Sequence, residues 1–303
     1  MYGIHPSDEH VALFKEKPFQ GQTPDQAEVI FCGTDANYSE ETSEHKFFER
    51  IKDYHRDPIA FWDGNDNKHH PFLLDEYPFN RKKGGVPFHR NFSRLELQAE
   101  QHAKRVTFLE ILDVPTVGNK SGHENTFFRL LCQGHLKYID RLIRAGGHKL
   151  FFVSIGVLGA IKTIKQTYPL LFSWYADSPP GEHFLKEING NRIKEIYHFS
   201  YPGIHSQIAE IRSDIDSWLS PYAVKFICPN PQPWSEIYQK LEAEWIARGR
   251  VGSPPPVPLI LNGWMASDNN AKHKRWLDTV RWAEQHDLLH LIPELPYEDQ
   301  YKS

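Results

Sequence analysis

An aspartate that follows a short apolar run is the first residue of this chain whose position could serve chemistry. Residues 29–31 are Val, Ile and Phe, Cys32 and Gly33 come next, and Asp35 stands two positions after the glycine. This pattern is typical of a buried strand that ends in a tight turn. Ligands of open α/β sheets bind at such strand ends. Asp35 therefore either activates water and stabilises a developing cation, or it is a turn residue that binds its own backbone.

A second carboxylate, Glu110, interrupts the apolar stretch of residues 105–112. A carboxylate at such a position either faces water at a sheet edge or is buried with a partner. At the floor of a pocket it could accept a hydrogen bond from an exocyclic amine, as acidic side chains do from N4 of cytosine. The sequence leaves both positions open.

An aromatic ring and a group of cations share one Gly- and Pro-rich stretch. Residues 85–88 are Gly-Val-Pro-Phe, so a loop presents Phe88, which could stack on a flat ligand such as a nucleobase or cover the core. The cations nearby suit phosphate contacts, or they form a solvated charge cluster. They are Arg81, Lys82, Lys83 and Arg90.

A third stretch, residues 200–206, reads Ser-Tyr-Pro-Gly-Ile-His-Ser and combines a strand end, a Pro-Gly turn and a helix start. His205 could donate a hydrogen bond to a leaving anion or to a phosphate from this position. The alternative is a helix-capping loop with an incidental histidine.

Alternating strand and helix patterns must position these residues. Strands are expected at residues 28–33, 105–112, 149–155 and 192–199, and helices near 44–56, 93–103, 124–145, 157–167, 205–219, 234–248 and 268–286. The alternation predicts an α/β fold in three layers, with a mostly parallel four-stranded central sheet that helices cover on both faces. We expect residues 1–27 to form an arm, and residues 57–92 to form a long irregular connection.

The composition of the 303 residues is that of an ordinary globular protein, with 40% hydrophobic and 24% charged residues. The net charge of −4 neither indicates nor excludes a nucleic-acid partner. No apolar run approaches the roughly 18 residues of a membrane span, and the first residues lack a signal-peptide pattern. We therefore expect a cytoplasmic protein without a membrane partner.

Cofactor sites have no clear pattern in the sequence. The cysteines, Cys32, Cys132 and Cys228, are too few for a four-cysteine site, and the histidines show no metal-binding spacing. We expect no metal, no iron–sulfur cluster and no other cofactor, and we favour a monomer.

Taken in order, these segments resemble the motifs of the uracil-DNA glycosylase superfamily, most closely those of its mismatch-specific uracil/thymine-DNA glycosylase branch. Residues 29–35 are similar to the branch's Val-Phe-Cys-Gly-Ile-Asn-Pro, and residues 85–88 to its Gly-Phe-Pro-Phe. Residues 106–116 resemble its second strand with a Pro-Thr exit, and residues 201–206 its Asn/His-Pro-Ser-x-x-Ser loop. The resemblance covers about residues 25–220.

The resemblance implies a monofunctional DNA glycosylase of the same fold, which acts on a base flipped out of double-stranded DNA without a cofactor. Asp35 would position water and stabilise the oxocarbenium-like sugar, with His205 as a second catalytic group. Phe88 would stack on the base and Glu110 would contact its edge. The other implied base contacts are Gly33, Thr34, Asn37 and Tyr38, and the implied DNA contacts are Pro202, Gly203, Ile204, Ser206, Arg81, Lys82, Lys83 and Arg90.

The resemblance also implies a domain organisation. Residues 1–220 would form the glycosylase-like domain with an insertion at about 39–84, and residues 221–303 a helical carboxyl-terminal extension packed on it. Residues 202–206 would enter the duplex, with Ile204 or His205 filling the space that the base leaves.

Three departures from the family pattern bear on the substrate. Asn37 and Tyr38 replace the usual Pro-Gly, and Tyr201 replaces the first His or Asn of the last motif. Glu110 stands where uracil-specific members use Asn. An ionised Glu would place acceptor against acceptor at O4 of uracil, whereas the N4 amine of cytosine suits it, so we expect a cytosine-type base.

One branch of the superfamily is implied to act in defence, by excising glucosylated hydroxymethylcytosine from phage DNA, and the long insertion would suit so bulky a base. Repair of uracil or thymine mismatches is the alternative. Two further classes also remain open, namely an enzyme on free nucleosides and a non-catalytic module that binds DNA or a partner.

Overall fold

The computed structural model describes residues 2–79, 86–176, 183–219, 231–250, 252–257 and 269–292. The chain divides into two compact units, Met1–Arg212 and Ser213–Ser303. Of the predicted site residues, Arg81, Lys82 and Lys83 lie outside the described residues, as does Gly85 of the Gly-Val-Pro-Phe motif.

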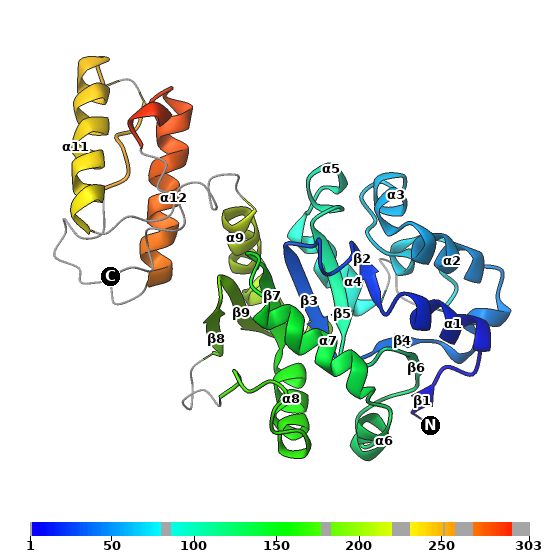
Figure 1. Ribbon diagram of the computed structural model, residues 1–303. Helices are drawn as coiled ribbons and strands as arrows, with labels where there is room; N and C mark the ends of the chain where they lie inside the picture. The colour runs from blue at the N-terminus through cyan, green and yellow to red at the C-terminus, as the bar shows by residue number, and fades with distance from the viewer. Residues whose placement is uncertain are drawn as a thin grey trace. The chain divides into compact units, whose positions relative to one another are not determined.

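A six-stranded mixed sheet forms the centre of the first unit (Figure 1). Its order is β2 (Phe19–Gly21), β5 (Val106–Glu110), β3 (Val29–Gly33), β7 (Leu150–Ser154), β9 (Asn191–Ile196) and β8 (Leu185–Ile188). The four inner strands are parallel, and β2 and β8 pair with them in antiparallel fashion. All four predicted strands are therefore confirmed, as is the α/β class, but two antiparallel edge strands widen the expected four-stranded sheet.

Both faces of this sheet are apolar. Ile30 of β3 belongs to a buried cluster with α7 (Gln133–Arg144) and α8 (Ile155–Thr167), which lie on one face. Phe31 points to the other face, where its ring meets those of Phe92, Phe152 and Phe199 at centroid distances of 4.9, 5.1 and 5.7 Å. A strand covered on both faces needs a continuous apolar run, which explains the sequence of β3.

The other helices of the first unit are mostly short. They are α1 (Asp8–Glu16), α2 (Phe48–Arg56), α3 (Pro58–Asp63), α4 (Pro87–Phe92), α5 (Ala99–His102) and α6 (Glu124–Arg129), with the 3-10 turns η1 (Glu40–Glu44), η2 (Pro71–Leu73), η3 (Ser93–Leu95) and η4 (Pro202–Ser206). The helix expected at 124–145 is two helices, α6 and α7. The helix α9 (Ile208–Trp218) follows η4.

Two expectations about irregular segments were wrong. Residues 1–27 contain β1 (Gly3–Ile4), α1 and β2, and residues 57–92 contain α3, η2 and α4. A second sheet, of order β1-β6-β4, joins β1 to β6 (Pro115–Val117) and β4 (Ala36–Tyr38). This small sheet ties the first residues of the chain to the segments that follow β3 and β5.

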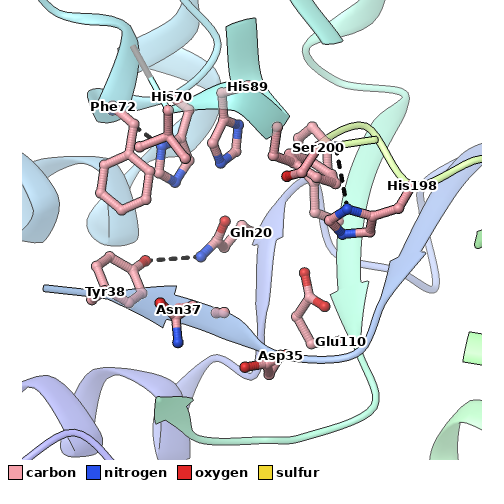
Figure 2. Close-up of a pocket in the computed structure, with 14 residues that line it drawn as sticks. Gln20, Asp35, Asn37, Tyr38, His70, Phe72, His89, Glu110, His198 and Ser200 are labelled. Atoms are coloured by element: carbon pink, nitrogen blue, oxygen red, sulfur yellow. Dashed lines mark hydrogen bonds between the residues drawn. The ribbon is translucent and has the colours of Figure 1, made fainter. Parts of the chain in front are cut away.

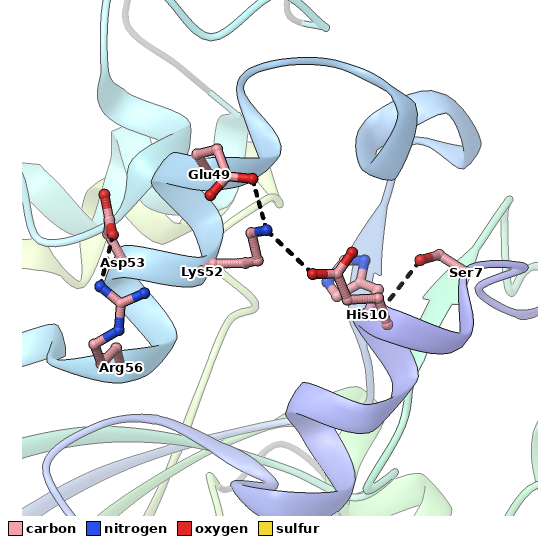
Figure 3. Close-up of polar contacts among 7 residues, drawn as sticks. Ser7, His10, Glu49, Lys52, Asp53 and Arg56 are labelled. Carbon is pink, nitrogen blue, oxygen red and sulfur yellow. Dashed lines mark hydrogen bonds and ion pairs between the residues drawn. The ribbon is translucent and has the colours of Figure 1, made fainter.

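A second core holds the segment 36–79 against α1. It contains Phe14, Tyr38, Phe48 and Tyr54, with the buried His10 among their rings. At its surface, Figure 3 shows Lys52 of α2 between two carboxylates; its Nζ lies 3.1 Å from Glu9 of α1 and 2.6 Å from Glu49. His10, a polar residue in the sequence, is thus part of a packed aromatic core.

The second unit is helical in its described part. It contains α11 (Pro231–Ala247), α12 (Asn269–Gln285) and the turn η5 (Leu289–Leu291), so both helices predicted here are confirmed. Leu241, Trp276, Val280 and Leu288 are buried in its core. In neither unit does a described helix have the length and apolar character that crossing a membrane requires.

Candidate active site

A cavity of about 240 Å³ opens at the carboxyl ends of β3 and β5. Five predicted site residues line it, namely Asp35, Asn37, Tyr38, Phe88 and Glu110. Figure 2 shows Asp35 and Glu110 on one side of the cavity and His70 and His89 on the other. We call the side with Asp35 and Glu110 the strand wall, and the side with His70, Phe72 and His89 the histidine wall.

The small sheet orients the Asp35 carboxylate. Tyr2 and Thr116 donate hydrogen bonds to its Oδ2 at 3.1 and 2.7 Å, and Thr34 donates to its Oδ1 at 2.8 Å. Three neutral hydroxyls from three segments fix the carboxylate, while the second lone pairs of its oxygens can still accept from a ligand. A turn residue bound only to its own backbone would not show this pattern.

Two of the predicted base contacts, Thr34 and Asn37, also help to hold Asp35. Thr34 donates to it, and Asn37 is exposed, with an amide that donates to Thr116 Oγ1 at 3.2 Å and to the carbonyl of Gly118 at 2.8 Å. Asn37 thereby helps to hold the hydroxyl that binds Asp35. Its amide is already engaged with the protein.

Glu110 lies directly over Gly33, its register partner in the parallel pair of β3 and β5. A Cβ atom at Gly33 would overlap the Glu110 carboxylate, so the glycine makes room for the acid. The residue as a whole is half-buried, but its Oε2 has no contact with solvent and no hydrogen-bond partner among the described residues. Burial, and then the charge of Asp35, raise the pKa of Glu110 to about 8.

Tyr38 is buried, with 3% of its surface exposed, and lines the cavity beside the strand wall. Its hydroxyl accepts a hydrogen bond from Gln20 Nε2 at 2.9 Å (Figure 2). Gln20 belongs to the antiparallel edge strand β2, which explains why sequence reasoning did not find it. The pair closes this side of the cavity with a phenol ring.

Phe88 occupies the first turn of α4 and is half-buried. Its ring centroid lies 5.3 Å from those of both His198 and Phe199, and 5.0 Å from that of His89. It is therefore neither a free loop aromatic nor a fully buried core residue. One side of the ring packs on the protein and the ring lines the cavity.

The histidine wall was not predicted. The rings of His70 and His89 stack at 3.7 Å with their planes 9° apart, and His69 Nε2 lies 3.0 Å from His89 Nδ1. Burial lowers the pKa of all three imidazoles well below the ordinary value, so the rings are neutral at neutral pH. The His70 Nδ1 accepts from the Phe72 N–H at 3.2 Å, so the ring hydrogen of His70 is on Nε2.

His198 also lines the cavity, two residues after β9, and sequence reasoning missed it. Its Nδ1 accepts from the Ser200 N–H at 3.2 Å. Although the residue as a whole is exposed, its ring lies against Phe88, and partial burial lowers its pKa. The neutral ring therefore carries its hydrogen on Nε2 and is a donor. The position of His198 near the end of the predicted strand 192–199, where ligands bind in α/β sheets, is the feature of the sequence that could have identified it.

The structure corrects the predicted roles of His205 and Ile204. His205 is exposed and is not among the residues that line the cavity, whereas His198 is. Ile204 is 0% exposed, so it cannot enter a duplex without leaving the core. The exposed aromatic side chain of this loop is Tyr201, with 55% of its surface accessible.

The remaining loop residues support Tyr201. A Cβ atom at Gly203 would lie 2.5 Å from the Tyr201 ring, and the Tyr197 ring lies at a centroid distance of 5.2 Å from it. Ser206 donates to the Gly203 carbonyl at 2.8 Å, and Pro202 begins η4 and is exposed. The loop is thus built around an exposed aromatic ring.

Of the predicted cations, Arg90 is the one that lies within the described residues. Arg90 lines a separate hollow of about 530 Å³ with Trp62 and His69, and the structure does not bring it to the cavity. Lys120, in the loop after β6, is the cation whose charge acts on both Asp35 and Glu110. Its Nζ lies 4.3 Å from the Phe127 ring, and burial lowers its pKa.

The buried histidines do not form a metal site. Within the described ranges, no group of three or more His, Cys, Asp or Glu side chains is arranged to hold a metal ion. The rings of His69, His70 and His89 contact one another by stacking and hydrogen bonding instead.

The chain matches no known protein-family model, and no curated protein and no solved structure shows significant similarity to it.

Proposed function

We propose that the protein is a monofunctional DNA glycosylase, which hydrolyses the N-glycosidic bond of a flipped-out, cytosine-type base and leaves an abasic site. The observation that carries this proposal is the cavity itself. It joins Asp35, Phe88 and Glu110, three residues from separate segments that each resemble a glycosylase motif. A base in a closed pocket, contacted by an aromatic face and a polar edge group, is the arrangement that base-flipping enzymes use.

Asp35 is the catalytic residue of this proposal. With its orientation fixed by three hydroxyls, it accepts a hydrogen bond from the attacking water and stabilises the positive charge that develops on the sugar. The water oxygen forms the new bond to C1′ while the bond from C1′ to the base nitrogen breaks. The electron pair of that bond leaves with the base, the water passes a proton to the Asp35 carboxylate, and a proton returned to the base completes the hydrolysis.

His198 stabilises the leaving base. As a neutral imidazole with its hydrogen on Nε2, it donates a hydrogen bond to a carbonyl oxygen of the base as negative charge develops there. A neutral donor suits this step because its hydrogen bond to the base becomes stronger as negative charge develops on the base in the transition state. Phe88 stacks on the base, and Glu110 contacts its edge.

Tyr201 replaces Ile204 as the residue that fills the space left in the duplex. Its ring is exposed and stands next to Ser200, which lines the cavity. Apolar and aromatic wedges inserted between base steps keep the duplex kinked and the nucleotide extruded. Pro202, Gly203 and Ser206 form its support in the minor groove, and Lys120, Arg81, Lys82 and Lys83 are the proposed phosphate contacts.

The narrower proposal is excision of glucosylated hydroxymethylcytosine from phage DNA in the cytoplasm. It rests on the resemblance and on the long segment between β4 and α4, part of which forms the histidine wall. Mismatch repair of uracil or thymine is the competing substrate class.

The test is base release from four duplexes, which contain uracil opposite guanine, thymine opposite guanine, hydroxymethylcytosine, or its glucosylated form. Alkaline cleavage scores the abasic sites, and the free nucleosides serve as comparison substrates. We expect the wild type to release base from a duplex that contains hydroxymethylcytosine or its glucosylated form. We expect Asp35→Asn to lose this base release. Equal base release by the wild type and Asp35→Asn would refute the proposed glycosylase activity. Faster base release from free nucleosides than from the duplexes would refute the proposal that DNA is the substrate.

A further inference from the structure

The Glu110 side chain has an environment that differs from that of Asp35. Its Oε2 has no contact with solvent and no hydrogen-bond partner among the described residues. The contact that this residue does make goes through its backbone, since its carbonyl oxygen lies 2.8 Å from His135 Nε2. A buried polar group without a partner is rare in folded proteins, and it indicates that a ligand supplies the missing contact.

In the described ranges, two charged groups face Glu110, each from a different segment. Asp35, after β3, has the same sign, and Lys120, after β6, is a partly buried cation that makes no ion pair with Glu110 in the described part of the chain. The Cys32 thiol, the Tyr38 phenol and the His198 imidazole are neutral at neutral pH. Among the described residues no group therefore forms an ion pair with an ionised Glu110, and the charge of Lys120 lowers its pKa less than burial and Asp35 raise it.

An ionised carboxylate without a partner is very unfavourable in such an environment, whereas the protonated acid is not. The pKa of about 8 agrees with this geometric argument. At neutral pH the group is therefore mostly a carboxylic acid, with one O–H donor and one C=O acceptor.

On the basis of the proposed function, we infer that Glu110 recognises the flipped base as a neutral carboxylic acid, which donates its O–H to one atom of the base edge and accepts an N–H from the adjacent atom. Cytosine offers N3 as the acceptor and the N4 amine as the donor. Uracil offers O4 as the acceptor and N3–H as the donor. Both edges satisfy the acid with two hydrogen bonds, because the acid can present its two oxygens in either order.

This inference changes the substrate argument made from the sequence. The preference for a cytosine-type base over uracil depended on an ionised Glu110, and a neutral acid removes the clash at O4. The expected substrates are therefore pyrimidine bases that carry a hydrogen-bond donor and a hydrogen-bond acceptor on adjacent positions, 3 and 4, of the ring. A methyl group on N3 abolishes this pairing in either base, so N3-methylated cytosine and uracil are excluded.

The experiment measures single-turnover base release against pH, from the duplexes containing uracil or hydroxymethylcytosine. In the wild type we expect release to be constant between about pH 6.5 and 8 and to fall about tenfold per pH unit above pH 8, because deprotonation of Glu110 removes the donor. Glu110→Gln keeps one donor and one acceptor but does not titrate. It should retain activity and lose the alkaline decline, whereas Glu110→Ala should lose base recognition at every pH.

Three outcomes would overturn the inference. They are an alkaline decline that persists in Glu110→Gln, a Glu110→Gln variant as inactive as Glu110→Ala, and normal release of an N3-methylated base. A ¹³C NMR titration of the carboxyl groups, with Glu110→Gln to assign the resonance, tests protonation directly; a Glu110 carboxyl that titrates near 4.5 would also overturn it.

Failure of the proposed function looks different. If the wild type releases no base from any duplex, or if Asp35→Asn releases base as fast as the wild type, the glycosylase itself is refuted. If the wild type is active and Asp35→Asn is not, the glycosylase stands, and only the Glu110 variants decide how it recognises the base.

Discussion

The two walls of the cavity are built on different principles. The strand wall places two carboxyl groups at the ends of adjacent parallel strands, with Asp35 held by three hydroxyls and Glu110 Oε2 without a partner among the described residues. The histidine wall is made of imidazole rings that stack on one another and are neutral because they are buried. The strand wall is suited to acid–base and electrostatic roles in a reaction. The histidine wall is suited to limiting the shape of the ligand and to donating hydrogen bonds to it.

The comparison teaches that burial acts in opposite directions on the two walls. Burial raises the pKa of an acid and lowers that of an imidazole, so both walls become neutral except for Asp35. A single oriented carboxylate in an otherwise neutral cavity concentrates its field on the bound ligand, because little competing charge screens it.

The largest expected effect is at Asp35. Asp35→Asn should reduce base release by about 10²- to 10⁴-fold, since it removes the acceptor for water and the negative charge beside the sugar. Asp113→Asn is the matched control, because Asp113 follows the same strand as Glu110 but does not line the cavity. Single-turnover rates and melting temperatures of both variants are the measurements. A comparable loss in Asp113→Asn would remove the special role of the strand wall.

The next effect separates His198 from His205. His198→Ala should reduce single-turnover base release by about 10²-fold, because the donor to the leaving base is lost. His205→Ala, an exposed residue in the following loop, should leave the rate unchanged. The reverse result would restore His205 as the catalytic histidine.

A smaller effect is expected at the loop. Tyr201→Ala should reduce release from duplex DNA about tenfold and leave release from single-stranded DNA and the melting temperature unchanged, since a wedge acts only on a duplex. Ile204→Ala should lower the free energy of unfolding by about 2–5 kcal/mol, because it creates a cavity in the core. Equal effects of Tyr201→Ala on both DNA forms would contradict the wedge.

The last prediction concerns the histidines behind the histidine wall. The pKa of His10 is lowered to about 2 and that of His55 to about 3, chiefly by burial. The folded state therefore binds fewer protons than the unfolded state, so stability is complete above about pH 6.5 and is lost as the pH falls below it.

His10→Phe should reduce this loss by about 1.4 kcal/mol per pH unit between pH 6.5 and 4, because phenylalanine does not titrate and the ring is surrounded by Phe14, Tyr38 and Phe48. Urea denaturation at several pH values measures it. A pH slope identical to that of the wild type would show that His10 does not contribute to the acid sensitivity.

Much of the strand wall could be predicted from the sequence. The four apolar runs became the four inner parallel strands, and parallel pairing places their carboxyl ends at one edge, which is why Gly33 and Glu110 lie opposite each other. The histidine wall could not be predicted in the same way. His69 and His70 stand among Gly, Pro and Asp residues, and a local pattern cannot show that a distant helix, α4, will cover them.

The sequence by itself determined the order of the candidate site residues along the chain. Asp35 follows one apolar run, Glu110 stands at the end of the next, and Phe88 lies between them. The sequence could do so because apolar periodicity and turn residues are local properties of the chain. Only the tertiary structure decided that Ile204 is buried, that His198 rather than His205 lines the cavity and that burial raises the pKa of Glu110. Exposure, proximity and pKa depend on which distant segments pack together, and no short stretch of sequence contains that information.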